Sequence, residues 1–441
     1  MRDQPKDGDQ PTDDGPFTEE DRQLLLELLR IPTVNPLEAA QDPPSELARA
    51  QRVYAAAAAR CGLRVVHHDS PPAECLRSDG VPSTVRRAAE QDPDFLANQP
   101  SLVLRLGPEL PRERTVMFNV HLDTVAGVEP VAFDGCTFTG RGAIDAKGPA
   151  VALLAGLRAA VRAEPALGRD VGVLVQAVAG EEGGAMGTFG TRPLVEAGWV
   201  GRLNVFCEPT GMRYSTRSTA SATARIAVAG RDAVDDHPDA GHNATVLLGF
   251  LAQHLAAELD PRGRTGRLCI GGVRTGSQHN RVYGSGELLV NLSYASSEEG
   301  AAAARELTET VRKGLAEFAA AFAGTREFAR TAADAASITD ISWIKRDLPS
   351  LDGSDPVTET ATEAVFERAG IARRSAGEPA FTCDAIWMDG VPEAGTAVLG
   401  PGLLESNNAH AASEHAHLDQ LRDFARAVPA VLSAFAQHRR A

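Results

Sequence analysis

The sequence lacks the closely spaced cysteines of a thiolate metal site or a disulfide framework. Six cysteines are scattered along the chain without any CxxC pair: Cys61, Cys75, Cys136, Cys207, Cys269 and Cys383. Disulfide-rich secreted domains carry denser and more regular cysteines, so we expect reduced thiols and a cytoplasmic protein. We interpret Cys207, which lies next to Glu208, as a small buried residue rather than a nucleophile.

Long apolar runs and a basic surface are missing as well. No apolar run approaches the roughly 20 residues that a membrane-spanning helix needs. The N-terminal stretch is acidic and proline-rich rather than basic and then apolar, so we expect no signal peptide. The formal net charge is −15, whereas binding to nucleic acid phosphates needs a basic face. We therefore expect neither a membrane nor a nucleic-acid partner.

What the chain does contain is enough apolar material for two domains. It has 441 residues, of which 43% are hydrophobic, and single cores seldom exceed about 250 to 300 residues. Residues 1–16 are polar and rich in Asp, Gly, Gln and Pro, so we expect a flexible tail. Residues 17–211 and 331–441 alternate strand and helix patterns. Residues 212–330 read strand, helix, strand, strand, helix, which is typical of an inserted α+β domain.

One stretch, residues 116–149, collects polar residues around the end of an apolar run. Residues 116–120 have the length and β-branched content of a buried strand, which places His121 and Asp123 at its carboxyl end. Side chains two positions apart on an extended segment point the same way, so we expect Asp123 to reach the ring nitrogen of His121 that a metal leaves free. Asp145 follows in a glycine-rich turn before an alanine-rich helix. Taken singly, all three are ordinary strand-end and turn residues.

Two further apolar runs also end in acids. Residues 171–179 lead into Glu181 and Glu182, and residues 203–207 lead into Glu208. Adjacent carboxylates at a strand exit can divide two tasks, one binding a cation and the other handling protons. Open α/β sheets place their sites at the carboxyl ends of strands. We therefore expect these acids to converge on one site.

Five motifs in a fixed order make the pattern specific. HLD, GRGAIDAKG, AGEEGG and CEPTG, followed by an LGPG turn and NAHAASE, resemble the motifs of the dinuclear zinc amidohydrolases. This family includes acetylornithine deacetylase, succinyl-diaminopimelate desuccinylase, aminoacylase and glutamate carboxypeptidase, and GRGAIDAKGP is most similar to its acetyl-lysine and acetylornithine deacetylase branch. Five motifs are far more specific than one. The resemblance implies an α/β catalytic domain of zinc-peptidase type, with a mixed sheet between helices, and an inserted α+β lid and dimerisation domain.

The resemblance also implies a set of metal ligands, in which Asp145 bridges two zinc ions. The implied ligands are His121, Asp145, Glu182, Glu208 and His410. His415 and His417 follow closely, but His410 comes first after the GPG turn and precedes Glu414 at the family's interval. Nitrogen and oxygen ligands also suit cobalt or manganese.

Glu181 is left free of metal and is implied as the general base. It takes a proton from the water between the metals, whose pKa a zinc ion lowers to about 7, and delivers it to the leaving nitrogen. Asp123 is the second predicted catalytic residue, and it acts indirectly by contacting the ring of His121. The expected activity is hydrolysis of an amide bond, foremost in an N-acyl amino acid or a related biosynthetic intermediate.

Two alternatives stay open. One is a peptide hydrolase of dipeptidase or carboxypeptidase type. The other belongs to a different class, a non-catalytic metal-binding relative, although such a protein has no physical need to keep a costly cluster of carboxylates.

The expected lid departs from the family's pattern at two positions. Val234 stands where the family has a histidine that is contributed across the dimer, and His237 is the nearby substitute. Ser293 stands where many members have an arginine that grips a substrate carboxylate, and serine cannot form a bidentate ion pair. Asn280 matches the lid asparagine that positions the substrate, and Gly402 of the GPG turn completes the predicted substrate site.

These departures predict an unusual small-molecule amide as substrate. It either lacks the usual free α-carboxylate or has that carboxylate bound by other cations, for which Arg274, Arg281 and His279 are candidates. The resemblance further implies a homodimer formed through the lid.

Overall fold

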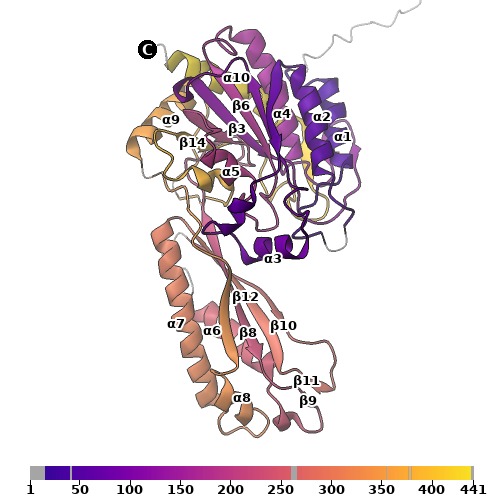
Figure 1. Ribbon diagram of the computed structural model, residues 1–441, viewed down its shortest axis with the longest axis vertical. Coiled ribbons are helices and arrows are strands. Elements are labelled where there is room, and N and C mark those ends of the chain that lie inside the picture. Colours follow the sequence, from indigo (N-terminus) through magenta and orange to yellow (C-terminus); the bar gives the residue numbers. More distant parts are fainter. Residues whose placement is uncertain are drawn as a thin grey trace, which may run out of the picture.

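The computed structural model describes residues 15–39, 42–259, 266–353, 355–375, 377–378 and 380–438. The tail predicted at residues 1–16 therefore lies outside the described residues, except for its last two positions. The chain folds into a larger and a smaller domain, which Figure 1 shows one above the other.

Six strands form the sheet of the larger domain, in the spatial order β1, β2, β6, β3, β7, β14. Their bounds are β1 Leu63–Asp69, β2 Ser101–Leu106, β3 Thr115–His121, β6 Gly172–Val178, β7 Leu203–Phe206 and β14 Gly395–Val398. Strands β3, β6, β7 and β14 run parallel, whereas β2 is antiparallel to both of its neighbours. The sheet is therefore mixed, and the predicted fold class is confirmed.

Helices cover both faces of this sheet, which explains the continuous apolar strands. Val116, Phe118 and Val120 of β3 point into one core, while Met117 points into another. The first core includes α1 (Glu19–Arg30), α2 (Leu47–Ala59), α4 (Lys147–Ala163), α9 (Pro356–Arg368) and α10 (Leu418–His438). The second core lies under α5 (Thr191–Glu196) and the short helix η4 (Asp384–Met388).

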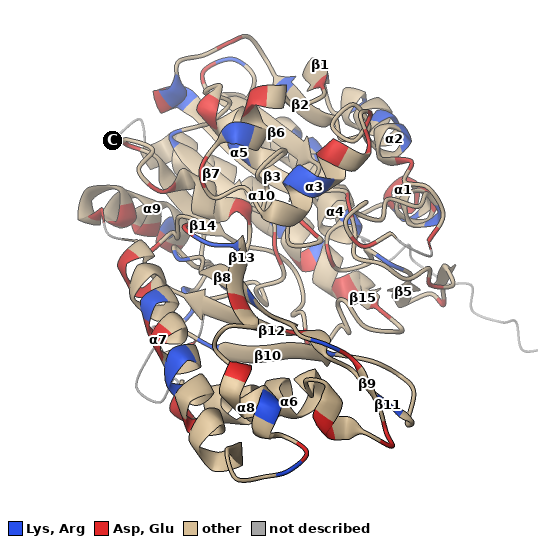
Figure 2. Ribbon diagram, turned by 60° about the horizontal axis from the view of Figure 1, so that its bottom comes forward, with Lys and Arg blue, Asp and Glu red and all other residues tan. Residues whose placement is uncertain are grey.

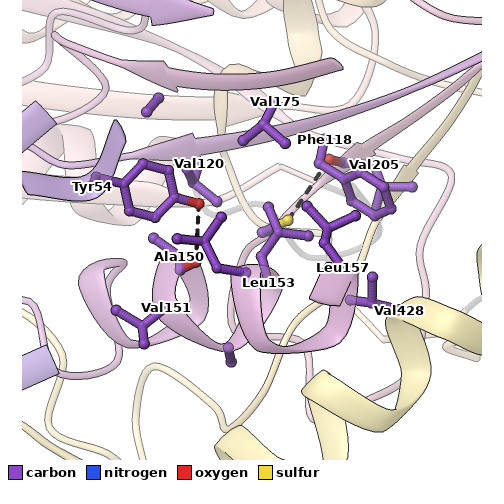
Figure 3. Close-up of a cluster of buried hydrophobic side chains, with 14 of the residues drawn as sticks. Tyr54, Phe118, Val120, Ala150, Val151, Leu153, Leu157, Val175, Val205 and Val428 are labelled. Atoms are coloured by element: carbon purple, nitrogen blue, oxygen red, sulfur yellow. Dashed lines mark hydrogen bonds between the residues drawn. The ribbon is translucent and has the colours of Figure 1, made fainter. Parts of the chain in front are cut away.

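The alanine-rich helix α4 is the centre of the first core (Figure 3). Leu153 and Leu157 of α4 pack toward the sheet, and the Tyr54 hydroxyl of α2 donates a hydrogen bond to the Ala150 carbonyl at 3.0 Å. A Cβ added at Gly156 would lie 2.6 Å from Cβ of Val428. Glycine at this position therefore permits the close approach of α4 and α10, which brings the C-terminal helix onto the sheet.

The smaller domain is a four-stranded antiparallel sheet covered by helices on one face. The spatial order is β10, β12, β8, β13. The bounds are β8 Ala220–Ala229, β10 Leu268–Arg274, β12 Ser285–Tyr294, β13 Thr339–Lys345, α6 Ala244–Glu258, α7 Ser297–Phe322 and α8 Ala329–Asp334. Figure 2 shows basic and acidic residues interspersed along α7, as expected for its solvated side. The sheet includes β13, which lies beyond the boundary expected at residue 330.

Short elements complete both domains. In the larger one, β4 (Ala132–Phe133), β5 (Thr137–Thr139) and β15 (His415–His417) form a three-stranded sheet, and η2 spans Arg112–Arg114. In the smaller one, β9 (Ala233–Val234) pairs with β11 (Arg281–Val282), next to η3 (Pro238–Ala240). Figure 1 shows β9 and β11 at the end of the smaller domain that points away from the larger sheet.

Residues 69–100 are rich in Pro, Asp, Ser and Arg, yet they are more ordered than this composition suggests. They form η1 (Ala73–Arg77) and α3 (Ser83–Gln91), and Val85 and Phe95 are buried in the first core. Phe95 packs edge-on against Phe189, with ring centroids 5.5 Å apart. A few well-placed apolar side chains therefore anchor the segment, and α3 packs against β13 of the smaller domain.

Within the described part of the chain, none of the helices combines the length and the apolar character needed to cross a membrane.

Candidate metal and active site

The carboxylate of Asp145 lies between two histidines. Its Oδ1 is 2.9 Å from Nε2 of His121, at the end of β3, and its Oδ2 is 3.1 Å from Nε2 of His410, in the loop before β15. The peptide bond between Asp145 and Ala146 is cis. One carboxylate thus faces two imidazoles, as a ligand shared by two cations would.

Two more acids complete the cluster, one beside each histidine. Glu208, which follows β7, has Oε1 4.0 Å from His121 Nε2, and Glu182, which follows β6, has Oε1 3.0 Å from His410 Nε2. Their ligand atoms form two groups that each lie within 4.8 Å: His121, Asp145 and Glu208, and Asp145, Glu182 and His410. A third such group joins His121 to Glu181 and Glu182. The structure therefore brings the predicted ligands together at one edge of the sheet.

Burial disfavours the charged forms of the acids in this cluster. Burial raises the pKa of Glu182 to about 7 and that of Glu208 well above its ordinary value. Burial also acts on Asp145, but hydrogen bonds from His121 and His410 outweigh it and lower the pKa of this carboxyl. The hydrogen bond to Asp145 and the nearby carboxylate of Glu182 raise the pKa of His410 to about 11.

Metal ions fit this environment. Oε1 of Glu182 is buried, and although it lies 3.0 Å from Nε2 of His410, it has no hydrogen bond of acceptable geometry among the described residues. Burying such an acceptor is costly, and a bound cation would offset that cost. Imidazole nitrogen with carboxylate oxygen is a donor set that suits zinc and also cobalt or manganese.

Asp123 lies beside the ring of His121 as expected, but its backbone carbonyl rather than its carboxylate accepts the hydrogen bond. Nδ1 of His121 donates to the backbone carbonyl of Asp123 at 2.9 Å, whereas the Asp123 carboxylate is 3.8 Å from that nitrogen. The chain leaves the strand after His121, so the carbonyl rather than the side chain comes next to the ring. This bond still fixes the tautomer, because a carbonyl accepts the Nδ1 proton and leaves Nε2 free for a ligand role.

The Asp123 carboxylate instead holds the loop that carries the two adjacent glutamates. It accepts backbone N–H bonds from Glu182 at 3.1 Å and from Glu181 at 3.4 Å. Asn35, which our sequence analysis missed, donates from its side chain to Asp123 at 3.0 Å and to the Glu182 carbonyl at 2.9 Å. The sequence feature that could have indicated Asn35 is its position in a Thr-Val-Asn-Pro turn shortly after α1.

Glu181 differs from its neighbour in having a free carboxylate. It is half-buried, and among the described residues its side chain forms no hydrogen bond or ion pair. Burial raises the pKa of Glu181 well above its ordinary value, against the attraction of His121. A carboxyl group with a raised pKa and no partner is typical of residues that act as general acids and bases.

The loop that carries His410 is anchored to the turn of Asp145. His410 has a left-handed backbone, with φ of 62°, and such strained non-glycine conformations persist only where the surroundings enforce them. The carboxylate of Glu414 accepts the backbone N–H groups of Ile144 at 3.1 Å and Asp145 at 3.2 Å, and it pairs with Arg141 at 2.8 Å. Glu414 therefore locks two distant segments together beneath the cluster.

Gly402, predicted as a substrate-binding residue, is placed for packing. It is buried with φ of 60°, and an added Cβ would lie 2.7 Å from Oδ1 of Asn407. Asn407 donates to the carbonyl of His415 at 2.9 Å and accepts from the backbone of Leu403 at 3.0 Å. The glycine thus allows Asn407 to close the loop around His410.

The predicted lid residues do not join the cluster of their own chain. Asn280 directly precedes β11, His237 precedes η3, and both are exposed. Val234 pairs with Arg281 between β9 and β11, at the end of the smaller domain that points away from the larger sheet (Figure 1).

Asp384 is a buried acid near the cluster that sequence reasoning missed. It is 1% exposed, its Oδ2 accepts a hydrogen bond from Thr191 at 2.5 Å, and its Oδ1 has no partner among the described residues. Burial raises the pKa of Asp384 to about 7. Its Thr-Cys-Asp-Ala setting was visible in the sequence, but nothing local indicated that it lies close to residues 200 positions away.

The fold and the cluster together are those of a two-domain metal-dependent hydrolase, with residues that could hold two metal ions at the strand ends of a mixed α/β sheet. Comparison with known proteins agrees. The chain belongs to peptidase family M20/M25/M40, whose family model matches residues 117–434.

One curated relative matches part of the chain. A protein of Aeropyrum pernix, provisionally named as a LysW-lysine/LysW-ornithine hydrolase, is 32% identical over 175 residues. That match covers 40% of this chain and 46% of the relative, so less than half of the relative's length is spanned.

Solved structures match over nearly the whole chain. Aminopeptidase PepT of Bacillus cereus superposes with a TM-score of 0.62 at 16% identity, covering 96% of this chain and 100% of its own. Human carnosine dipeptidase 1 gives 0.64 at 15% identity, covering 96% and 97%. YxeP of Bacillus subtilis, described as a dinuclear metal binding peptidase, gives 0.59 at 10% identity, covering 95% and 98%. At these identities the likeness establishes the fold.

Proposed function

We propose that the protein is a metal-dependent hydrolase that cleaves the amide bond of an N-acyl amino acid or a related biosynthetic intermediate. The observation that carries this proposal is the sharing of Asp145 by two histidine-carboxylate groups, with the free carboxylate of Glu181 beside them. Membership of the family and the names of the relatives support hydrolysis of an amide.

The proposed metals are two divalent cations, with zinc as the first choice and cobalt or manganese as alternatives. His121, Asp145 and Glu208 would hold one ion, and Asp145, Glu182 and His410 the other. When bound, such ions polarise a carbonyl group and lower the pKa of water.

The residues of the chain supply the proton transfer and the positioning. Glu181 takes a proton from the attacking water and gives it to the leaving nitrogen, for which its raised pKa and free carboxylate suit it. Asp123 and Asn35 hold the Glu181–Glu182 loop through the hydrogen bonds described above. The carbonyl of Asp123 orients the ring of His121.

A peptide hydrolase of dipeptidase or carboxypeptidase type is the second candidate. It is supported by the names of the solved structures that share the fold, which include an aminopeptidase and a dipeptidase. A comparison of N-acyl amino acids with dipeptides as substrates separates the two.

We further propose a homodimer formed through the smaller domain. His237 and Asn280 lie at its far end, so they can contribute to substrate binding only in the site of another subunit. Strand β10 is an edge strand of its sheet, which leaves backbone groups for pairing with a partner. A cytoplasmic location is proposed on the six free cysteines.

The decisive experiment combines elemental analysis with a substrate screen. The purified protein is assayed on N-acetyl and N-succinyl amino acids and on dipeptides, with and without a chelator. About two metal ions per chain and chelator-sensitive amine release support the proposal. A protein that binds no metal, or binds metal and hydrolyses no amide, contradicts it.

A further inference from the structure

Lys345 is the last residue of β13 and points from the open face of the smaller sheet. It lies opposite Thr223 of β8, which in turn lies opposite Asn291 of β12. Directly opposed residues of paired strands point to the same side. The other side carries Ala224 and Val290, which are buried under α6 and α7. Lys345 therefore stands on the uncovered face, at the edge of the sheet next to the larger domain.

A small apolar cluster fixes this edge against the larger domain. Its buried members are Met186, Ala220, Ala222, Tyr294, Leu348 and Ile386. The Tyr294 hydroxyl donates to the Leu348 carbonyl at 2.9 Å, and the Trp387 ring nitrogen donates to the Met186 carbonyl at 2.6 Å. Met186 lies on the segment that follows Glu181 and Glu182. The cluster therefore holds the end of β13 beside the loop of the proposed general base.

The ammonium group of Lys345 faces this loop across open space. A Cβ added at Gly184 would lie 3.9 Å from Nζ of Lys345, with nothing else within 4 Å apart from the chain neighbours of the glycine. Burial lowers the pKa of Lys345 to about 8, and the carboxylate of Glu181 opposes that shift. The lysine thus lies beside the loop of the acid that is proposed to protonate the leaving nitrogen.

Lys345 also differs from the cations that sequence analysis favoured. Arg274 pairs with Glu287 at 3.4 Å, and Arg281 pairs with Asp232. In the described parts of the chain, Nζ of Lys345 has no hydrogen bond and no ion pair. An ammonium group that is half-buried without a partner costs free energy, and an anion bound beside it offsets that cost.

We propose that Lys345 binds a carboxylate of the substrate, on the leaving-amine side of the scissile bond. This inference rests on the proposed amide hydrolysis and narrows its substrate class to N-acyl amino acids with a free carboxylate. Ser293 lies on the same face of the sheet as Asn291 but carries no charge, so the anion is held from the edge strand β13 instead of from β12. The amine side is assigned because Lys345 lies beside the Gly184 loop, which also carries Glu181, the residue proposed to serve the leaving nitrogen.

The test compares a charged ligand with its neutral counterpart. Zinc-loaded wild-type protein, Lys345→Met and Lys345→Arg are assayed on Nα-acetyl-ornithine and Nα-acetyl-lysine and on the carboxamide form of each. Lys313→Met is the matched control, because Lys313 lies on α7 in the same domain and pairs with Glu258 at 3.5 Å. Binding of the same four ligands is measured by calorimetry on Glu181→Gln protein, with and without Lys345→Met.

Loss of a charge-assisted hydrogen bond raises the KM and the Kd of the carboxylate ligands about 10- to 100-fold in Lys345→Met. The carboxamides are bound as before, kcat stays close to wild type, and Lys345→Arg retains the preference because it keeps the charge. Equal losses on both ligand forms, or a wild-type protein that does not prefer the carboxylate, overturn the inference. Failure of the proposed hydrolysis appears separately, as absent turnover in a protein that still prefers the carboxylate in calorimetry.

Discussion

The carboxylate of Asp123 accepts a hydrogen bond from the backbone N–H of Glu182, at 3.1 Å. A side chain at the end of β3 thereby orients the loop that follows β6, across 59 positions of sequence. The proposed proton donor and one proposed metal ligand depend on that loop for their position, so changes that loosen it are expected to affect both.

Asn35→Ala removes two donors from this loop. It leaves one oxygen of Asp123 and the carbonyl of Glu182 short of a hydrogen bond in a buried setting, and we expect a loss of about 1 to 3 kcal/mol in the free energy of unfolding. Urea denaturation measures it, with Asn98→Ala as an exposed control expected to stay within about 0.5 kcal/mol. If both variants unfold at the same urea concentration as the wild type, Asn35 does not hold the loop.

Glu181→Gln separates proton transfer from metal binding. We expect kcat to fall by about 10²- to 10⁴-fold, because an amide side chain cannot accept and return a proton. The metal content, measured by elemental analysis, stays at the wild-type value, whereas Glu182→Gln lowers it. A Glu181→Gln protein with wild-type turnover would exclude Glu181 as the general base.

We expect removal of metal to destabilise the protein. Ions bound only by the folded state stabilise it by about 2.7 kcal/mol when present at 100 times their Kd, and they compensate the buried acids Glu182 and Glu208. We expect a chelator to lower the Tm, measured by scanning calorimetry, and added zinc to restore it.

Substitution of the histidines identifies the ligand on the C-terminal loop. His410→Ala is expected to abolish most of the zinc-dependent shift in Tm, because its Nε2 faces Asp145 and Glu182. His417→Ala is the control, since His417 is exposed and contacts Thr137 at 3.1 Å. If His417→Ala abolished the zinc-dependent shift and His410→Ala did not, His417 rather than His410 would be the metal ligand.

Asp384→Asn changes the pH dependence of stability in metal-depleted protein. Burial raises the pKa of Asp384 to about 7, whereas an unfolded chain has an aspartate pKa of about 3.9. Between these two pKa values the folded state therefore binds more protons than the unfolded state. As pH rises through this range, Asp384 lowers the free energy of unfolding of the wild type by at most about 1.4 kcal/mol per pH unit.

Asparagine cannot ionise, so the variant lacks this contribution. Urea denaturation at pH 5, 6 and 7 is expected to show a flatter profile for Asp384→Asn than for the wild type. Asp340→Asn, at an exposed position of β13, keeps the wild-type slope. Parallel profiles for wild type and Asp384→Asn would mean that Asp384 stays ionised in the folded protein.

The sequence by itself determined the strands that carry the site and the polar residues that follow them. β3, β6 and β7 are buried on both sides and therefore appear as largely apolar runs, and the polar residues of the site lie at the end of each strand or within four positions after it. Hydrophobic runs and periodicity are local properties of the sequence, so they can be recognised without knowledge of the fold. Because these strands are parallel neighbours, the residues at their ends meet at one edge.

Only the tertiary structure decided which residues far apart in the sequence form hydrogen bonds with one another. Asn35 and Asp123 meet across 88 positions, and Thr191 and Asp384 across 193, so no local pattern could indicate either pair. The backbone course after β3 decided that the carbonyl of Asp123, rather than its carboxylate, orients His121. The pairing of β13 with β8 brought Lys345 beside the Gly184 loop, because strand pairing joins segments far apart in the chain by backbone hydrogen bonds that depend little on side-chain identity.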